Sequence, residues 1–498
     1  MVLGEVLKGT GAALDTVTAS LEIAGITHDS RRVRPAFAFF ALTGRMADGH
    51  SYAADAMKHG AAACICERRI EGLPLPQVVL PNARRALAFA AANFYGNPQR
   101  RMRLVGVTGT NGKTSTAYML KTIFSHGGYK TALLGTAKGS IGDAAYTPPL
   151  DAAEADEYET MTTPDPEVLY RTLADLAARG VEVTVMEASS HALALDKLAP
   201  IEFALGIFTN LSHEHLDFHG SMENYLAAKA KLFDSCRVGL FNADDAAGRE
   251  LLQNTACRAV SYGLTPPCDY LAEEIESYGV RGSSYLLHTR GARFRVKTQI
   301  PGSFTLYNTL AAAAAARECG VDLVCIQNAL YALRGIAGRL EKVNLGFMGG
   351  AFTVFIDYAH TPFALENLLR CVRAFRGTGQ RIVTLFGCGG ARDREKRPEM
   401  GRIAVENSDF VILTSDNPRA EEPQAILADI LKGVGKADNY TVIENRREAI
   451  EYAVANALAG DIILLVGKGH EQYEIDKDGL HPFSETEIVQ EAAERYRS

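Results

Sequence analysis

A glycine-rich stretch near residue 110 has the residue types that bind phosphate. It reads Gly106-Val107-Thr108-Gly109-Thr110-Asn111-Gly112-Lys113-Thr114. Small residues let backbone N–H groups face an anion, a lysine can neutralise the β- and γ-phosphates, and a neighbouring hydroxyl can bind Mg²⁺. The general pattern has glycine where this chain has Val107, and a tight turn with a surface lysine is the alternative. Because strand, loop and helix patterns agree, we predict an ATP site made by Gly109, Thr110, Asn111, Gly112, Lys113, Thr114 and Ser115.

Acids and histidines follow the next two apolar runs. Glu187 follows Val181 to Met186, where a carboxylate can reach Mg²⁺ at the carboxyl edge of a sheet. Phe203 to Phe208 runs into Thr209-Asn210-Leu211-Ser212-His213-Glu214-His215-Leu216-Asp217. A single histidine there would most simply be a structural imidazole. The clustering of histidine, asparagine and acid favours a functional site.

Three apolar runs near the C-terminus each end in a loop that carries cations. Ile382 to Phe386 leads to Gly387 through Arg392, Phe410 to Leu413 leads to Asp416-Asn417-Pro418-Arg419, and Ile462 to Val466 leads to Gly467-Lys468-Gly469-His470-Glu471. Ligands of open α/β sheets bind at the carboxyl ends of strands. Arginines pair with a carboxylate and an acid takes an ammonium, so the loops together predict a pocket for an amino acid. Solvated loops with surface ion pairs are the alternative.

The elements that position these residues alternate between strand and helix patterns. Such alternation predicts an α/β fold with a mostly parallel sheet covered by helices. Linker-like stretches at Tyr95 to Arg100 and at Arg334 to Arg339 divide the chain into three domains, 1–98, 99–337 and 338–498. We expect a small N-terminal α/β domain, a central P-loop-type domain with a mostly parallel sheet, and a C-terminal Rossmann-like domain.

Several element boundaries can be stated in advance. Strands are expected at Val33 to Leu42, Ala61 to Cys66, Leu104 to Val107 and Thr353 to Ile356, besides the runs already named. Helices are expected at Ala83 to Phe94, Ser115 to Ser125 and the alanine run Ala311 to Ala316. The acidic stretch Pro148 to Asp165, with Asp151, Glu154, Asp156, Glu157 and Glu159, is expected to be a long loop.

Composition limits the classes of protein that fit. The 498 residues are 47% hydrophobic and 22% charged, which is ordinary for a soluble globular protein and excludes a disordered one. A net charge of -7 gives no footprint for nucleic acid. Nine cysteines without a CxxC pair suggest reduced thiols. Neither a membrane helix of about 18 apolar residues nor a secretory signal is expected, so we predict a cytoplasmic protein without a membrane partner.

Nine short motifs, taken in order, resemble the Mur ligases, and within them the branch that adds the third residue of the peptidoglycan stem peptide. They are Thr-Gly-Thr-Asn-Gly-Lys-Thr (108–114), Thr-Thr-Pro (162–164), Met-Glu-Ala-Ser-Ser-His (186–191), Thr-Asn-Leu-Ser-His-Glu-His-Leu-Asp (209–217), Tyr-Asn (307–308), Gly-Arg-Leu-Glu (338–341), Asp-Tyr-Ala-His-Thr-Pro (357–362), Asp-Asn-Pro-Arg (416–419) and Gly-Lys-Gly-His-Glu (467–471). The resemblance covers nearly the whole chain. The family's own loop is Gly-Thr-Asn-Gly-Lys-Thr, which accounts for Val107.

The resemblance implies an ATP-dependent, ADP-forming, amide-forming ligase that uses ATP and Mg²⁺. ATP would phosphorylate the D-Glu carboxylate of UDP-MurNAc-L-Ala-D-Glu, and an amino group would then attack the acyl phosphate. A free carboxylate is a poor electrophile, so phosphorylation supplies a leaving group while the protein supplies alignment and charge. We expect a monomer that takes part in cell-wall precursor synthesis.

The same resemblance implies roles for individual residues. Catalysis falls to Lys113, Glu187, His215 and Lys229, and the metal site to Thr114, Glu187, His215 and Lys229. Further nucleotide contacts are Asn308, Arg339 and Asp357. The UDP-sugar-peptide would contact Ser30, Thr162, Thr163, Ser189, Ser190 and the loop Gly44-Arg45-Met46-Ala47. Lys229 matches the family's carbamylated lysine, a cation turned into a carboxylate-like ligand. Glu214 stands where the family usually has aspartate.

The Asp-Asn-Pro-Arg motif is similar to the version associated with meso-diaminopimelate. The implied contacts are Arg392, Asp416, Asn417, Pro418, Arg419, Gly467 and Glu471. Arg419 would pair with the distal carboxylate, which L-lysine lacks, and an unpaired buried guanidinium costs on the order of several kcal/mol. Three alternatives stay open: an L-lysine-adding ligase, a ligase like folylpolyglutamate synthetase, and a nucleotide-binding scaffold without catalysis.

Overall fold

The computed structural model describes residues 1–44, 47–136, 139–151, 154–155, 157–158, 161–289, 291–346 and 351–495. By its internal contacts the chain forms two compact units. The first unit contains residues 1–271, 288–292 and 310–326, and the second contains residues 272–287, 293–309 and 327–498. Among the described residues, no helix combines the length and the apolar character that crossing a membrane requires.

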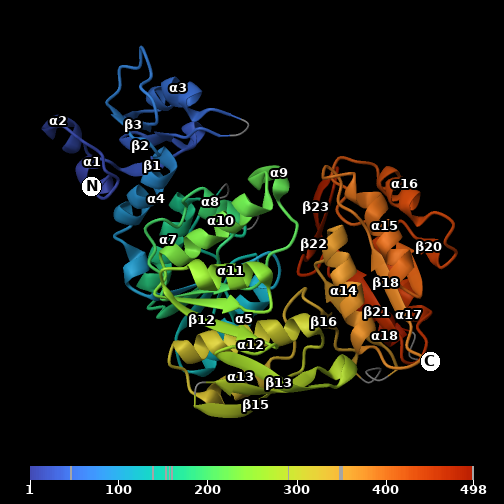
Figure 1. The fold of residues 1–498 in the computed structure, drawn as a ribbon. Helices are drawn as coiled ribbons and strands as arrows, with labels where there is room; N and C mark the ends of the chain where they lie inside the picture. Colours follow the sequence, from blue (N-terminus) through green and yellow to red (C-terminus); the bar gives the residue numbers. More distant parts are fainter. Residues whose placement is uncertain are drawn as a thin grey trace. The chain divides into compact units, whose positions relative to one another are not determined.

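The first unit begins with a four-stranded parallel sheet in the order β1-β2-β3-β4 (Figure 1). Its elements are β1 (Gly25–Thr27), β2 (Phe37–Ala41), α3 (Ala53–Lys58), β3 (Ala61–Cys66), β4 (Gln77–Val79) and α4 (Ala83–Phe94). The predicted bounds of β3 and α4 are confirmed. The strand predicted from Val33 is shorter than expected because Pro35 has no N–H and Ala36 adopts a φ of 64°.

A large sheet follows, in the order β15-β14-β13-β12-β11-β10-β5-β9-β6-β7-β8. Its strands in the first unit are β5 (Arg103–Thr108), β6 (Thr131–Leu134), β7 (Ser140–Ile141), β8 (Ala144–Ala145), β9 (Val183–Glu187), β10 (Leu205–Phe208), β11 (Val238–Asn242) and β12 (Arg258–Gly263). From β12 to β6 all neighbours pair in parallel. The carboxyl ends of β5, β9 and β10 therefore meet at one edge, as predicted.

Helices of the first unit cover this sheet (Figure 1). They are α5 (Lys113–His126), α7 (Pro166–Ala178), α8 (Ser190–Ala194), α9 (Leu216–His219), α10 (Met222–Asp234) and α11 (Ala246–Asn254). In α5, Leu120, Ile123 and Phe124 are completely buried. Burial of each such side chain stabilises the fold by about 1.5–3 kcal/mol. The apolar stripe thus holds the start of α5 at the end of β5.

The acidic stretch before α7 is not simply a loop. Glu154, Ala155, Glu157 and Tyr158 are helical, whereas Asp156 and Glu159 lie outside the described residues. Glu154 is buried and forms ion pairs with Arg32 and Arg171. The prediction of a long loop was wrong for these residues, because the sequence gives no sign of the arginine partners of Glu154.

The second unit contains a six-stranded sheet in the order β16-β17-β21-β18-β19-β20 (Figure 1). Its elements are β16 (Glu341–Lys342), β17 (Thr353–Asp357), α14 (Pro362–Phe375), β18 (Ile382–Phe386), α15 (Lys396–Asn407), β19 (Phe410–Leu413), α16 (Pro423–Val434), β20 (Tyr440–Val442), α17 (Arg446–Ala455), β21 (Ile462–Val466) and α18 (Glu485–Arg495). One apolar core joins the sheet to α14, α15 and α16, and a second joins it to α17 and α18. This is the predicted Rossmann-like arrangement, and the bounds of β18, β19 and β21 are confirmed.

Several strands had no counterpart in the predictions. Among them are β13 (Tyr270–Ser277), β14 (Ser283–Thr289), β15 (Ala292–Thr298) and the hairpin formed by β22 (Tyr473–Asp476) and β23 (Gly479–Pro482). The alanine run is confirmed as part of α12 (Ser303–Glu318), and α13 (Leu323–Ala332) follows it. The chain is therefore α/β, as predicted, while the domain boundaries at 98 and 337 stay predictions.

Candidate active site

The glycine-rich loop connects β5 to α5 in the first unit. Gly112 precedes the helix with a φ of 83°, and Gly109 has a φ of 144°. A Cβ atom on Gly109 would lie 1.9 Å from Thr209 Oγ1, so only glycine fits against the end of β10. The first turn of α5 directs its backbone N–H groups out of the helix, where they can bind an anion.

Two residues of the loop use their amides to hold the neighbouring strand end. The N–H groups of Thr110 and Asn111 donate to the backbone oxygen and to Oδ1 of Asn210, at 2.8 and 3.0 Å. The N–H groups of Thr110 and Asn111 are therefore already engaged within the protein. Asn210 belongs to a motif named in the sequence analysis, but its contacts with the glycine-rich loop were not predicted. Its position soon after the end of a strand was the feature of the sequence that could have indicated them.

Lys113 lies over its own loop. Its Nζ donates to the backbone oxygens of Gly109 at 3.0 Å and Thr110 at 2.8 Å. The ammonium is thus held at the mouth of the loop, on the side where the helix presents its N–H groups. This position suits a side chain that neutralises phosphate.

Glu187 ends β9 and is 1% exposed. Its Oε2 accepts a hydrogen bond from Thr114 Oγ1 at 3.1 Å, and its Oε1 accepts from the N–H of Thr136 at 2.9 Å. The Thr136 hydroxyl lies 3.1 Å from that of Thr162. The predicted metal residues Thr114 and Glu187 are therefore brought together. Thr136 was missed, and no sequence motif marks it.

These oxygens fit a magnesium ion by their chemistry. Mg²⁺ is usually held by one or two carboxylates together with substrate phosphates and water, rather than by a cage of side chains. A hydroxyl and a buried carboxylate beside a phosphate loop provide such a set. Across the described part of the chain, no group of three or more His, Cys, Asp or Glu side chains could hold a metal by itself.

Lys229 comes from α10 and is 1% exposed. Its Nζ donates to the backbone oxygen of Gly109 at 2.7 Å and lies 4.3 Å from the ring centre of Tyr225. Burial, and then the charge of Lys113, lowers the pKa of Lys229 well below its usual value. Lys229, the lysine predicted to be carbamylated, therefore lies against the glycine-rich loop.

His215 precedes α9 with a φ of 56° and packs edge-on against His191, 4.9 Å between ring centres. Burial lowers the pKa of both imidazoles, and for His191 the value falls to about 4. Both rings are therefore neutral near pH 7. His219 Nε2 lies 3.0 Å from Ser190 Oγ, so one predicted substrate hydroxyl is engaged within the protein.

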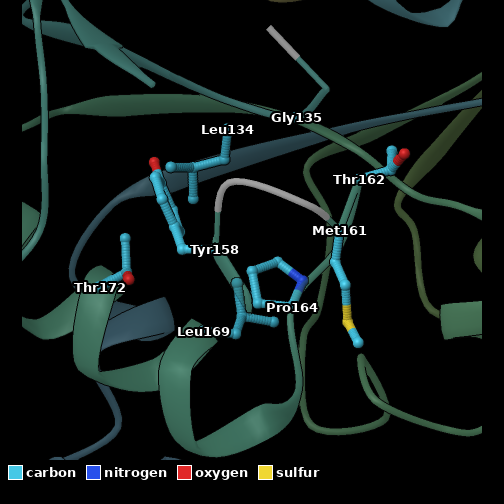
Figure 2. A pocket seen from close by; sticks show the side chains of 8 residues that line it. All are labelled: Leu134, Gly135, Tyr158, Met161, Thr162, Pro164, Leu169 and Thr172. Carbon is cyan, nitrogen blue, oxygen red and sulfur yellow. The ribbon is translucent and has the colours of Figure 1, made fainter. Parts of the chain in front are cut away.

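The Thr-Thr-Pro motif is fixed to the end of β9. Thr163 Oγ1 donates to the backbone oxygen of Glu187 at 2.9 Å and accepts from the N–H of Ser189 at 3.2 Å. The four predicted contacts Thr162, Thr163, Ser189 and Ser190 therefore gather beside Glu187. Thr162 also lines a cavity of about 10 Å³, which has room for about one water molecule (Figure 2).

Ser30 belongs to the N-terminal sheet region, where the structure shows a polar cluster. His28 Nδ1 lies 2.8 Å from Glu167 Oε1, and Lys197 pairs with Asp165 at 2.6 Å. Burial lowers the pKa of His28, but the Glu167 carboxylate outweighs it and raises the pKa to about 9. The predicted uridine loop includes Arg45 and Met46, which lie outside the described residues.

A wider cavity of about 570 Å³ lies between α10 and α11. Its floor is apolar, and its charged lining residues are Glu223, Asp234, Asp245 and Glu250. All four are acids, which repel phosphates. This cavity is therefore unsuited to ATP, and the phosphate loop remains the candidate.

Of the nucleotide residues predicted in the second unit, Asp357 lies on β17, Arg339 in the turn before β16 and Asn308 on α12. Asp357 ends β17 and accepts backbone hydrogen bonds from Leu340 at 2.8 Å and from Ala359 at 2.9 Å. The Arg339 guanidinium lies 5.0 Å from the ring centre of Tyr358. Asn308 lies buried in α12.

The motifs at 338–341 and 467–471 meet. A Cβ on Gly338, where φ is 66°, would lie 2.2 Å from the backbone nitrogen of His470. The rings of Tyr358 and His470 lie 5.1 Å apart. Glycine at this position therefore lets the two loops touch, as well as providing the left-handed turn.

The three cation-bearing loops emerge at one edge, because β21, β18 and β19 are parallel neighbours. Asn417 Nδ2 donates to Glu471 Oε2 at 2.7 Å. Arg419 has a φ of 55° and donates to the backbone oxygens of Gly390 at 3.0 Å and Asn417 at 3.3 Å. The structure thus brings Asp416, Asn417, Pro418, Arg419, Gly467 and Glu471 together, while Arg392 is exposed on the first loop.

Lys468 differs from the expectation that each loop supplies a cation to a ligand. It is 0% exposed, and its Nζ donates to Asn417 Oδ1 and to the backbone oxygen of Tyr473. Two further buried cations were missed. Arg397 pairs with Glu421 and Asp429, and Arg446 pairs with Glu485. The alternation pattern places such residues on helices but gives no signal of their partners.

Comparisons with known proteins agree with the order of the motifs. Residues 107–316 match the Mur ligase middle domain, residues 338–469 the Mur ligase glutamate ligase domain, and residues 22–95 the Mur ligase family catalytic domain. A Clostridium tetani protein named UDP-N-acetylmuramoyl-L-alanyl-D-glutamate–2,6-diaminopimelate ligase is 39% identical over 498 residues, covering 99% of each chain.

Solved structures give the same picture. A structure of a ligase with that same name has a TM-score of 0.71 and 30% identity, and the match covers 100% of this chain and 99% of the other. A Mycobacterium tuberculosis folylpolyglutamate synthase complexed with ADP and AMPPCP has a TM-score of 0.62 at 20% identity, covering 82% of this chain and 94% of the other. The second likeness is one of fold alone.

Proposed function

Because the chain belongs to the Mur ligase family, we propose that it joins meso-diaminopimelate to the D-Glu carboxylate of UDP-MurNAc-L-Ala-D-Glu at the expense of ATP. It is an ATP-dependent, amide-forming ligase, as the family is. The product would be a peptidoglycan precursor, made in the cytoplasm where ATP and nucleotide-linked sugars are available. We expect the ligase to act as a monomer.

One observation supports the choice of amino acid: an acid and a guanidinium lie at the same sheet edge of the second unit. Glu471 is held by Asn417, and Arg419 is held by the carbonyl of Gly390. Diaminopimelate carries an ammonium for the acid and an additional carboxylate for the guanidinium. L-Lysine offers the ammonium only and leaves Arg419 without an anionic partner.

The proposed chemistry has two steps. A carboxylate oxygen of the D-Glu residue attacks the γ-phosphorus, the bond to the β-phosphate oxygen breaks, and ADP leaves. The amino group of diaminopimelate then attacks the acyl carbon, inorganic phosphate leaves with the carbon–oxygen electron pair, and the amine loses its proton. Lys113 and the N-terminal turn of α5 would stabilise the charge on the phosphates, mainly by position and electrostatics.

Thr114 and Glu187 would hold Mg²⁺, which supplies charge neutralisation between the two anionic substrates. Glu187 is kept in place by the hydroxyl and amide of Thr136, so its carboxylate stays directed at the loop. Lys229, placed against Gly109, is proposed to be carbamylated and to add a second carboxylate-like group near the phosphates. His215 completes the proposed set.

The test is a ligation assay with the purified protein, ATP, Mg²⁺ and UDP-MurNAc-L-Ala-D-Glu. We expect kcat/KM for meso-diaminopimelate to exceed that for L-lysine by about a hundredfold, since L-lysine cannot form the charge-assisted pair with Arg419. Equal values for the two amino acids would contradict the proposal.

Arg419→Ala sharpens that assay. The KM for diaminopimelate should rise by about two orders of magnitude while the KM for ATP stays within about twofold, because the lost pair is charge-assisted and bidentate. Arg402→Ala is the matched control, since Arg402 pairs with Glu406 on the surface of α15 in the same unit. A parallel fall in ATP affinity would assign Arg419 a different role.

The remaining alternatives are separated by phosphate release. Release only with L-lysine supports the lysine-adding ligase, and release only with folate and glutamate supports a ligase like folylpolyglutamate synthetase. A protein that binds ATP but releases no phosphate with any of these substrates would be a scaffold.

A further inference from the structure

Lys468 is a buried cation in the loop after β21. It is 0% exposed and follows Gly467, which approaches Asp416 closely. Its Nζ donates to Asn417 Oδ1 at 2.8 Å and to the backbone oxygen of Tyr473 at 2.9 Å, where β22 begins. The ammonium therefore serves the protein's own groups and does not reach a ligand directly.

The contact with Asn417 determines which way that amide points. An ammonium can only donate, and the N–H of Ile475 also donates to Asn417 Oδ1, at 3.0 Å. Two donors on one side require the amide oxygen there. The NH₂ group must then face the other way, where it donates to Glu471 Oε2 at 2.7 Å.

Glu471 is in turn left with one oxygen for a ligand. Asn417 occupies Oε2, and in the described part of the chain no hydrogen bond engages Oε1. A carboxylate held by one oxygen has a fixed direction for the other, which is the arrangement that a binding site for an ammonium needs.

We propose that Lys468 is a positioning residue of the amino-acid site, which acts through Asn417 to orient Glu471 and thereby determines the affinity for the ligand's ammonium group. This inference rests on the proposed function, because it assigns Glu471 to an amino-acid substrate. Lys468 itself touches neither substrate nor nucleotide.

A purely structural role would be the simpler alternative. The Lys468 ammonium lies 5.4 Å from the ring centre of Phe483, and its loop connects β21 to the hairpin of β22 and β23. Loss of that packing would lower stability and weaken every substrate alike. Loss of the Asn417 orientation would weaken only the amino acid, so the two roles have different kinetic signatures.

Lys468→Met keeps an unbranched side chain of similar length and removes the donor. In the full-length protein with ATP and UDP-MurNAc-L-Ala-D-Glu, we expect the KM for diaminopimelate to rise about ten- to a hundredfold, since a hydrogen bond to a charged group is lost. The KM values for ATP and the nucleotide-sugar peptide should stay within about twofold. Lys436→Met, on an exposed lysine of the same unit, is the matched control.

A double-mutant cycle with Asn417→Ala tests the route of the effect. If Lys468 acts through Asn417, then Lys468→Met should change the KM for diaminopimelate less than about threefold when residue 417 is already alanine. Effects that multiply independently would overturn the inference. So would equal changes in the KM of all three substrates.

Failure of the proposed function gives a different result. A wild-type protein that ligates L-lysine instead would contradict the diaminopimelate assignment, and the same cycle with L-lysine would then decide the role of Lys468.

If Lys468→Met does not fold, Lys468→Gln, which retains an N–H donor group, must show a smaller rise in the amino-acid KM. An unchanged KM in a folded variant counts against the inference.

Discussion

Two lysines, Lys229 in the first unit and Lys468 in the second, are both buried, but the charges and hydrogen-bond acceptors around them differ. Both are at most 1% exposed, and burial lowers the pKa of each. Lys468 has two hydrogen-bond acceptors, and the charge of Asp416 opposes the effect of burial. Lys229 has the oxygen of Gly109, and the neighbouring charge of Lys113 adds to the effect of burial.

The difference separates a structural cation from a reactive amine. A buried ammonium with acceptors and acids around it is stabilised in its charged form, so it can act as a rigid donor. A buried amine next to another cation is driven toward its neutral form, which is the form that attacks CO₂. We therefore expect the two lysines to differ in reactivity although both are hidden from solvent.

The largest expected effect follows from Lys229→Met. Removing a group that organises charge around the phosphates should lower kcat by about a hundred- to a thousandfold, and the change should appear with every amino acid tested. In ¹³C NMR with labelled bicarbonate, a carbamate signal should be present in the wild type and in Lys468→Met but absent in Lys229→Met. A signal that survives Lys229→Met would show that the contrast between the two lysines is wrong.

Arg446→Met tests whether the surroundings of Lys468 depend on a second buried cation. Arg446 donates to the backbone oxygens of Ser415 and Val466, both at 3.0 Å, and pairs with Glu485 at 2.7 Å. Removing it leaves a buried carboxylate and two carbonyls unpaired, so the free energy of unfolding should fall by about 3–5 kcal/mol.

Urea denaturation measures that change, with Glu485→Leu combined with Arg446→Met as the control. Replacing both members of a buried pair by apolar residues is often close to neutral, so the double variant should regain most of the lost stability. A double variant as unstable as the single one would mean that packing, and not charge, is what Arg446 provides.

The smallest expected effect is a pH dependence of the KM for diaminopimelate that the KM for ATP does not share. Burial, helped by Asp416, raises the pKa of Glu471 although Asn417 and Lys468 oppose the shift. The carboxyl therefore becomes protonated at a higher pH than an exposed glutamate, and the KM for diaminopimelate should rise as the pH falls through that raised pKa. The KM for ATP should change less over the same range.

The contribution of Glu471 to stability changes with pH in the direction opposite to that of the affinity for diaminopimelate. Because its pKa is higher in the folded than in the unfolded state, the folded chain binds the proton more tightly, and this group destabilises the fold as the pH rises through that pKa. Amino-acid affinity and the Glu471 contribution to stability should therefore move in opposite directions. A KM for diaminopimelate that is flat with pH would exclude Glu471 as the ammonium partner.

Much of the fold could be predicted from local pattern. β18 and β21 are fully buried runs between helices and β19 is nearly so, and their bounds follow from β-branched and leucine-rich composition. The hairpin of β22 and β23 could not be predicted, because its residues are partly or fully exposed and lack a clear alternation of apolar and polar side chains. The helical turn at Glu154 was missed because its stability comes from distant arginines.

The candidate site shows the same limit. Glycines, acids and cations at strand ends led to Lys113, Glu187, Asn417 and Glu471, because chemistry and spacing are both visible in the sequence. Whether a cation faces a ligand or the interior is decided by tertiary contacts, which is why the buried position of Lys468 could not be predicted. Thr136 was missed for a related reason: a threonine in a loop has no pattern that distinguishes it.

The hydrogen bonds of Lys113 hold the cation of the phosphate loop in place within the fold itself. Its ammonium donates to the backbone oxygens of Gly109 and Thr110. A side chain that the fold already orders has little conformational entropy left to lose when an anion binds. Ordering this lysine is therefore a small part of the free-energy cost of binding ATP.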